Sequence, residues 1–206
     1  YAQGDIASDW FEVISGTVRT CHLYCDGHRQ LTGFHYPGDI FGIESGHYSS
    51  SAEAVTAVVL RRSPRGTGEE SRLSATTFVQ EAYQSALDKA QACIFLLGRR
   101  TATERMAAFL LATAQRFADD KAFALPMSRS DIADHLGLTI HTVSRTLSEF
   151  VRRNLIRLDG PQSITILNHA GLSQLANGDE EPNRHGSAMP PLANAHPTDL
   201  ALQFGS

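Results

Sequence analysis

Side chains that can bind DNA gather in the stretch TIHTVSRTLSEFVRR, residues 139–153. If this stretch is a helix, one face carries an apolar stripe and the opposite face carries groove-reading and phosphate-binding side chains. That second face holds Ile140, His141, Ser144, Arg145 and Ser148. They lie in the N-terminal half of the helix, where recognition helices meet bases. The spacing therefore predicts binding to a DNA groove.

Other chemistry has little support in the sequence. It contains no Gly-rich phosphate loop and no HExxH, GxSxG or CxxC pattern. The three cysteines, Cys21, Cys25 and Cys93, are an odd number without a paired framework, which favours a reducing cytoplasm. Three thiols at these spacings do not make a four-cysteine iron–sulfur site. We expect no enzyme, no metal site and no cofactor, and thiol oxidation is a hypothesis for these residues.

Two short helices must position the 139–153 residues. Ser128 or Ser130 can cap a first helix, and Gly137 suits the left-handed position that ends it. Thr139 can then cap a second helix that runs to about residue 154. A short helix, a glycine turn and a longer helix define the helix-turn-helix. Residues 156–158 and 163–167 predict a two-stranded ribbon behind it, which is the wing of a winged helix.

A second periodic stretch begins near residue 76. Its apolar residues recur at steps of four and three, close to a coiled-coil seam: Val79, Tyr83, Leu87, Ala90, Ile94 and Leu97. Two interpretations stay open, a helix packed on its own domain and a dimer helix whose contacts are Tyr83, Leu87, Ala90, Ile94 and Leu97. Gly98 interrupts the pattern, so a hinge is expected there before a further helix over 101–118.

The N-terminal residues predict short strands separated by turns. The expected strands cover 10–14, 17–24, 29–36 and 52–60, and the charged segment 61–72 is expected to be a loop. The fold class is therefore α+β, with an N-terminal antiparallel β-roll, a long helix and a C-terminal winged helix-turn-helix. The expected divisions are an N-terminally incomplete roll (1–75), a dimerisation helix and hinge (76–100), the DNA-binding domain (101–176) and a flexible or peripherally docked tail (177–206).

Composition is that of an ordinary globular protein. The 206 residues are 42% apolar and 19% charged, with a net charge of −4. No apolar run approaches the roughly 20 residues of a membrane span, so no membrane partner is expected. Residues 128–158 hold five arginines against three acidic residues, so this part is positive in an acidic chain. That asymmetry permits a local DNA-binding face.

The chain resembles the CRP/FNR family of bacterial regulators. GTVRT and DGHRQLTGFHYPGDIFGIESG resemble the family's effector-domain roll, which is the cyclic-nucleotide-binding type. ERMAAFLLATAQRF is similar to its helix after the hinge, and RSDIADHLGLTIHTVSRTL resembles its helix-turn-helix nearly position by position. The resemblance covers about residues 1–176. Within the family the chain looks most like the FixK branch, the regulators of nitrogen fixation and microaerobic respiration.

The resemblance implies a homodimer that binds a palindrome of the TTGA–N6–TCAA type and contacts RNA polymerase, usually as an activator. By matched position the base-reading residues are Ile140, His141, Ser144 and Arg145. Arg145 would read guanine, because a guanidinium donates two hydrogen bonds to O6 and N7. His141 departs from the family's usual Glu. Its imidazole can accept, donate or make no contact, so the preferred base there stays open.

Phosphate contacts are expected around the same helices. Ser128, Arg129, Thr139 and Arg152 lie near helix starts or flanks, where hydroxyls and backbone N–H groups bind phosphate. Thr142 and Ser144 can touch a thymine or a phosphate.

The residues of the roll also indicate which ligands it could bind. Cyclic-nucleotide binders of this family have an Arg that pairs with the phosphate. Glu44 matches their pattern, but Ser49 or Ser50 occupies the place of that Arg. Without a guanidinium the phosphate loses its bidentate partner, so we expect no cyclic nucleotide. A haem would need one of His22, His28, His35 or His47 as a ligand. No effector is the leading interpretation, and a nucleotide- or haem-responsive regulatory protein is the alternative.

Two further classes compete with this assignment. A roll with helices for protein contacts, as in kinase regulatory subunits, would need an intact nucleotide pocket. A winged-helix repressor of unrelated ancestry would lack the turn-rich roll.

Overall fold

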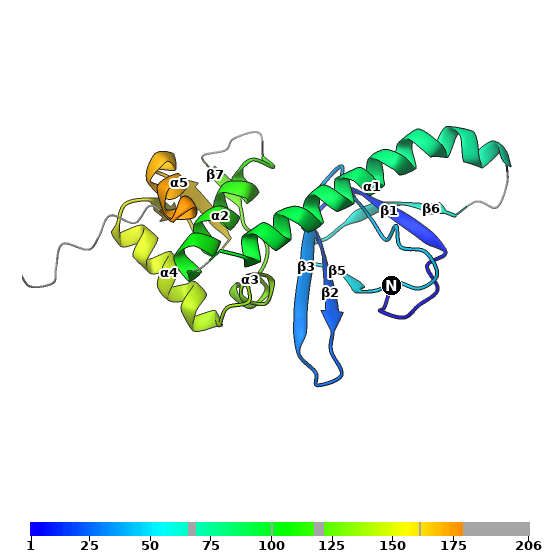
Figure 1. Cartoon of the computed structure of the whole chain (residues 1–206). Coiled ribbons are helices and arrows are strands. Elements are labelled where there is room, and N and C mark those ends of the chain that lie inside the picture. Colours follow the sequence, from blue (N-terminus) through cyan, green and yellow to red (C-terminus); the bar gives the residue numbers. More distant parts are fainter. Residues whose placement is uncertain (66–68, 100, 118–121, 161, 179–206) are drawn as a thin grey trace, which may run out of the picture.

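The protein consists of two halves joined by one long helix (Figure 1). The computed structural model describes residues 1–65, 69–99, 101–117, 122–160 and 162–178, and for residues 69–79 it describes the backbone alone. Helix α1 (Glu69–Leu97) runs along the N-terminal half and ends at the C-terminal half. The α+β fold expected from the sequence is confirmed. The tail expected at 177–206 lies outside the described residues from position 179 onward.

The N-terminal half is a roll of two three-stranded antiparallel sheets, ordered β4-β1-β6 and β3-β2-β5. Val13, Val18 and Phe41 are buried between them. The strands are β1 (Asp9–Ser15), β2 (Val18–Leu23), β3 (Arg29–His35), β4 (Ile40–Phe41), β5 (Ser51–Ala54) and β6 (Val59–Pro64).

The structure corrects the sequence prediction after residue 50. The single strand expected at 52–60 is two strands, β5 and β6, which lie in different sheets. The loop expected at 61–72 was also wrong, since β6 continues to Pro64 and α1 begins at Glu69. The charged side chain of Arg61 on β6 pairs across strands, since it forms an ion pair at 2.7 Å with Glu12 of the neighbouring strand β1.

The C-terminal half combines four helices with a small sheet. Its helices are α2 (Ala102–Ala114), α3 (Arg129–Leu136), α4 (Ile140–Arg152) and α5 (His169–Asn177). Its sheet has the order β7-β9-β8, with β7 (Ala122–Ala124), β8 (Ile156–Leu158) and β9 (Ser163–Ile166). The expected two-stranded ribbon therefore has a third strand, and the helix expected at 101–118 ends earlier, at Ala114.

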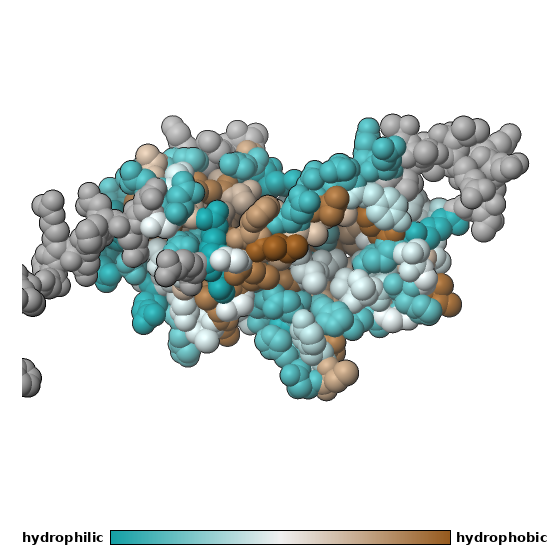
Figure 2. Space-filling view, in the orientation of Figure 1, coloured by the Kyte–Doolittle hydropathy of each residue, from teal (hydrophilic) through white to brown (hydrophobic). Residues whose placement is uncertain are grey.

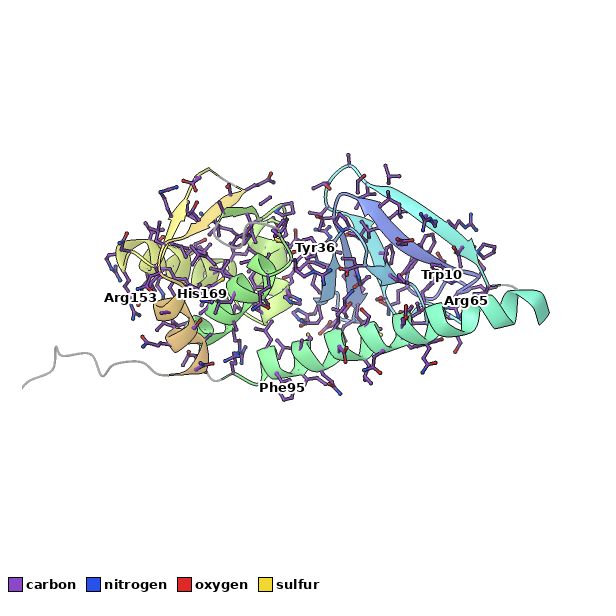
Figure 3. The ribbon with its side chains drawn as sticks, turned by 90° about the horizontal axis from the view of Figure 1, so that it is seen from above. Trp10, Tyr36, Arg65, Phe95, Arg153 and His169 are labelled. Atoms are coloured by element: carbon purple, nitrogen blue, oxygen red, sulfur yellow. The ribbon has the colours of Figure 1, made fainter. Side chains whose placement is uncertain are left out.

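One large core fills the C-terminal half. Met106 and Leu110 of α2, Leu136 of α3 and Phe150 of α4 are fully buried in it. Tyr36 of the roll belongs to the same core, so the two halves are in contact. Figure 3 shows Tyr36 at the junction between them. Of the helices described, none is long and apolar enough to cross a membrane.

Candidate nucleic-acid interface

Helix α3 begins at a reciprocal cap. The hydroxyl of Ser128 accepts a hydrogen bond from the backbone N–H of Asp131 at 3.1 Å, and the Asp131 carboxylate accepts one from the N–H of Ser128 at 3.1 Å. Both free donors are satisfied, which is the capping-box arrangement. Of the two serines predicted as caps, Ser128 is therefore the one used.

A tight turn at Gly137 connects α3 to α4. Gly137 has φ 62° and ψ 43°, the left-handed conformation predicted from the sequence. Two residues later the Thr139 hydroxyl accepts a hydrogen bond from the N–H of Thr142 at 3.1 Å and caps α4. Arg105, which the sequence interpretation missed, donates to the carbonyl of Leu136 at 3.1 Å. No local pattern marks Arg105, because its partner lies 31 positions away.

Helix α4 presents the predicted base-reading residues to the outside. Its inner side is buried in the core through Val143, Thr146, Leu147 and Phe150. On the other side Ile140 is 49% exposed, His141 and Arg145 are exposed, and Ser144 is half-buried. The four share one helical face because their positions differ by one, four and five residues.

The predicted phosphate-binding residues divide into two groups. Arg129 donates to the Ser144 hydroxyl at 3.1 Å, so the start of α3 lies beside the base-reading face. Thr139 and Thr142 share a 2.9 Å hydrogen bond at the start of α4. Arg152 is exposed in the last turn of α4, about 18 Å along the axis from Ile140. The structure therefore does not bring Arg152 to the same place.

The wing lies behind α4. Arg157 of β8 forms an ion pair with Asp159 at 2.5 Å, and this bond together with one from Thr165 lowers the pKa of Asp159. The two elements that the sequence did not predict support the domain from other sides. Phe123 of β7 and Leu172 of α5 are buried in the core.

Most of the apolar stripe of α1 is exposed to solvent. Tyr83, Leu87 and Ile94 are 48%, 52% and 69% exposed, Ala90 is exposed and Leu97 is half-buried. Figure 2 shows brown, apolar side chains on the end of α1 nearest the C-terminal half, and Figure 3 shows Phe95 pointing away from both halves. The stripe is therefore not buried on its own domain, although the Tyr83 hydroxyl donates to the Ile43 carbonyl of the roll at 3.0 Å. A different side of α1, with Ala82 and Cys93, is covered instead. A dimer interface along the stripe stays a prediction.

The three cysteines differ in how deeply they are buried. Cys21 is buried, Cys25 is exposed and Cys93 is half-buried. Burial raises the pKa of the Cys21 and Cys93 thiols, which lowers the fraction of reactive thiolate. Within the described residues, no three His, Cys, Asp or Glu side chains come together in a group that could hold a metal.

A cavity of about 910 Å³ lies between the roll, α1 and α2. Glu44, Ser49 and Ser50 line it, and Ser49 donates to Glu44 at 3.1 Å. His22 and His35 also line it, and burial lowers the pKa of His35 to about 4. His28 and His47 are exposed elsewhere.

A capped short helix, a left-handed glycine and an outward-facing second helix with a wing define a winged helix-turn-helix DNA-binding protein. The Crp-like helix-turn-helix domain family matches residues 104–175, and the cyclic nucleotide-binding domain family matches residues 1–70.

Named relatives agree with this class. The chain is 40% identical to the nitrogen fixation regulation protein FixK of Rhizobium meliloti, over 86% of this chain and 82% of that one. It is 36% identical to the transcriptional activatory protein AadR of Rhodopseudomonas palustris, over 85% and 77%. The solved structure of FixK2 from Bradyrhizobium japonicum matches with a TM-score of 0.79 and 37% identity, covering 85% of this chain and 90% of that one. The chain belongs to the CRP/FNR family of transcription regulators.

Proposed function

We propose that this regulator binds a palindromic operator as a homodimer and activates transcription under oxygen limitation. The observation that supports this proposal is the outward face of α4, where Ile140, His141 and Arg145 are exposed beside Ser144. A helix with such a face fits the major groove, and two copies read two half-sites one turn apart. The partners are double-stranded DNA and RNA polymerase, and the compartment is the cytoplasm.

The dimer is supported by the exposed stripe on α1. Apolar side chains at steps of four and three are the pattern by which two helices pack along a common seam. Tyr83, Leu87, Ala90 and Ile94 supply that pattern, and burial of the exposed apolar area would stabilise the pair. Leu97 extends the seam to the hinge.

The names of the relatives support activation and a role in nitrogen fixation. AadR is named a transcriptional activatory protein, and FixK a regulator of nitrogen fixation. The resemblance to the FixK branch extends the same assignment to microaerobic respiration.

For the roll we propose no cyclic nucleotide and no iron–sulfur cluster. Ser49 and Ser50 leave a nucleotide phosphate without its bidentate arginine at this place in the roll. The second candidate is a ligand-responsive regulator, favoured by the cavity of about 910 Å³. Addition of cyclic AMP or cyclic GMP separates the two, since unchanged thermal stability and DNA affinity support the first and a rise in either supports the second.

Fluorescence anisotropy tests the DNA-binding proposal. The full chain is titrated into a TTGA–N6–TCAA duplex and a scrambled duplex across a salt series. The proposal predicts tighter binding to the palindrome, and phosphate contacts predict that affinity falls as salt rises. Equal weak binding to both duplexes would count against sequence-specific reading of this palindrome.

A further inference from the structure

Helix α3 touches the roll as well as the recognition helix. Its residues Asp131 and Asp134 face the hairpin of β2 and β3, where Arg19, Arg29 and Gln30 meet them. We call these five residues the roll–helix clamp. Figure 1 shows the same neighbourhood, with α3 beside β3 at the junction of the two halves.

The clamp combines charge-assisted hydrogen bonds of the two arginines with one neutral hydrogen bond of Gln30. Arg19 donates to Asp131 at 2.5 Å. Arg29 donates to Asp134 at 2.6 Å and to Asp131 at 3.2 Å. Gln30 adds a 2.8 Å bond to the backbone carbonyl of Asp134. The Asp131 side chain is 4% exposed, so the bonds to Asp131 are less screened by salt than surface ion pairs.

The same carboxylate serves two purposes. One oxygen of Asp131 closes the cap of α3 with Ser128, and the other accepts from the two arginines of the roll. The first turn of the helix-turn-helix is therefore fastened directly to the roll. The pairing is specific in geometry, because each Asp131 oxygen has its own partners.

Uncharged contacts continue the interface next to the clamp. His135 donates through Nδ1 to the Leu31 carbonyl at 3.2 Å, and the carbonyl fixes Nδ1 as the protonated nitrogen. Phe34 lies edge-on to His135 with ring centroids 5.3 Å apart. A separate charged contact joins Arg116, just after the end of α2, to Asp39 of the roll.

We propose that Arg19 and Arg29 are positioning residues that set which half-site spacing the regulator accepts. The inference rests on the proposed function, because it concerns two recognition helices on one palindrome. The chain link from α1 to α2 is short and begins with Gly98, a residue of high backbone freedom. The clamp restricts that freedom by tying α3 to the roll, and thereby helps to fix α4 relative to α1.

Loss of the clamp has two consequences for DNA binding. Only part of the released population would have α4 correctly placed, so the apparent affinity for the correct spacing falls by that fraction. The affinity for duplexes with other spacings would fall less, because the C-terminal halves can rotate to reach half-sites at those spacings. A residue that only stabilised the fold would lower binding to every spacing alike.

The test measures affinity for TTGA–Nx–TCAA duplexes with x of 5, 6 and 7. It compares the wild-type chain, the double variant Arg19→Ala/Arg29→Ala and the control Arg61→Ala. Arg61 is a matched control because it is also a roll arginine in an ion pair, with Glu12, but lies outside the clamp. A charge swap, Arg29→Asp with Asp134→Arg, is compared with each single reversal, and thermal unfolding verifies that every variant is folded.

The wild type and Arg61→Ala are expected to prefer N6 over N5 and N7 by about tenfold or more. The double variant should lose about tenfold on N6 and discriminate among spacings by less than about threefold. The charge swap should recover part of the discrimination that each single reversal loses, because it restores the pair between positions 29 and 134 but leaves a carboxylate at position 29 facing Asp131. Folded clamp variants with the wild-type spacing profile would overturn the inference. A wild type that binds none of the palindromes would instead contradict the proposed function.

Discussion

Arg145 is the residue on which we propose that sequence reading depends most. It is exposed on α4, and within the described part of the chain it forms no ion pair. Its guanidinium is therefore free to meet a base edge. Ser144, one residue earlier, is already engaged by Arg129 at 3.1 Å, so Arg145 has the more available donors.

Replacement of Arg145 by alanine should weaken binding to the palindrome by about 1–3 kcal/mol per half-site contact, or about 5- to 150-fold. Binding to the scrambled duplex should change far less, since a base contact carries the sequence information. Anisotropy titrations of both duplexes measure the difference.

Arg153→Ala is the matched control. Arg153 follows α4 at its far end and pairs with Glu149 at 3.7 Å. Its loss should leave the preference for the palindrome unchanged. An equal loss of preference in both variants would contradict the assignment of Arg145.

For single residues, the sequence predicts which side chains face outward, because the period of a helix controls that placement. The outward placement of Ile140, His141 and Arg145 follows from the apolar stripe on the opposite side of α4, and the structure confirms that placement. Their contacts with DNA stay predictions. The pairing of Arg19 with Asp131 could not be predicted, because 112 positions separate them and only the folded chain brings them together.

The helix-turn-helix depends on backbone geometry at its turn. Gly137 is left-handed, and a Cβ there would meet nothing closer than 3.7 Å. The cost of a side chain is therefore backbone strain and not a clash. Other glycines with positive φ lie outside this turn, so Gly137 alone tests the connection between α3 and α4.

Gly137→Ala should destabilise the C-terminal half by about 1–2 kcal/mol, because an L-residue other than Asn or Asp is strained in this conformation. Thermal unfolding monitored by circular dichroism measures the loss. Gly137→Asn is the control and should lose less, since Asn adopts the left-handed region more readily. Equal losses in the two variants would show that the turn is not the cause.

Elements with strong local signals were predicted and short ones were not. The caps at Ser128 and Thr139 and the glycine at 137 marked α3 and α4 correctly. Strand β7 is three residues long, too short for a periodic pattern, and it is recognisable only through its pairing with β9. The charged part of strand β6 resembles a loop in the sequence, because Arg61 and Arg62 find their partners on β1, far away along the chain.

Acid stability is a property of the whole molecule. Burial lowers the pKa of His35, in the roll, to about 4, and burial lowers the pKa of His135, between the halves. Unfolded histidine titrates near about 6.5. As pH falls from 6.5 toward 4 the unfolded chain binds protons that the folded chain does not, so stability present above 6.5 is lost.

The Tm should therefore fall steadily between pH 6.5 and pH 4.5. In His35→Gln and His135→Gln the fall should be shallower, because Gln retains hydrogen-bonding groups and does not titrate. Calorimetry of the three proteins over this range measures the slopes. Identical slopes would show that these two histidines are not responsible.

A charge placed in the apolar stripe of α1 tests the proposed dimer. Ile94→Asp places a charge in the exposed stripe of α1, where burial against a second copy would leave it desolvated. Analytical ultracentrifugation should show a dimer for the wild type and a monomer for the variant. Ile6→Asp, at a residue 73% exposed on the roll, should stay dimeric. A dimer that survives Ile94→Asp would place the interface elsewhere.

In the proposed dimer, two copies of α4 read a two-fold symmetric site. Selection of bound duplexes from a fully randomised pool tests it directly, because the outcome does not depend on an assumed sequence. Symmetric reading by the dimer predicts enrichment of inverted half-sites one helical turn apart, whichever base faces His141. Enrichment of an asymmetric or single site, or no enrichment at all, would contradict it.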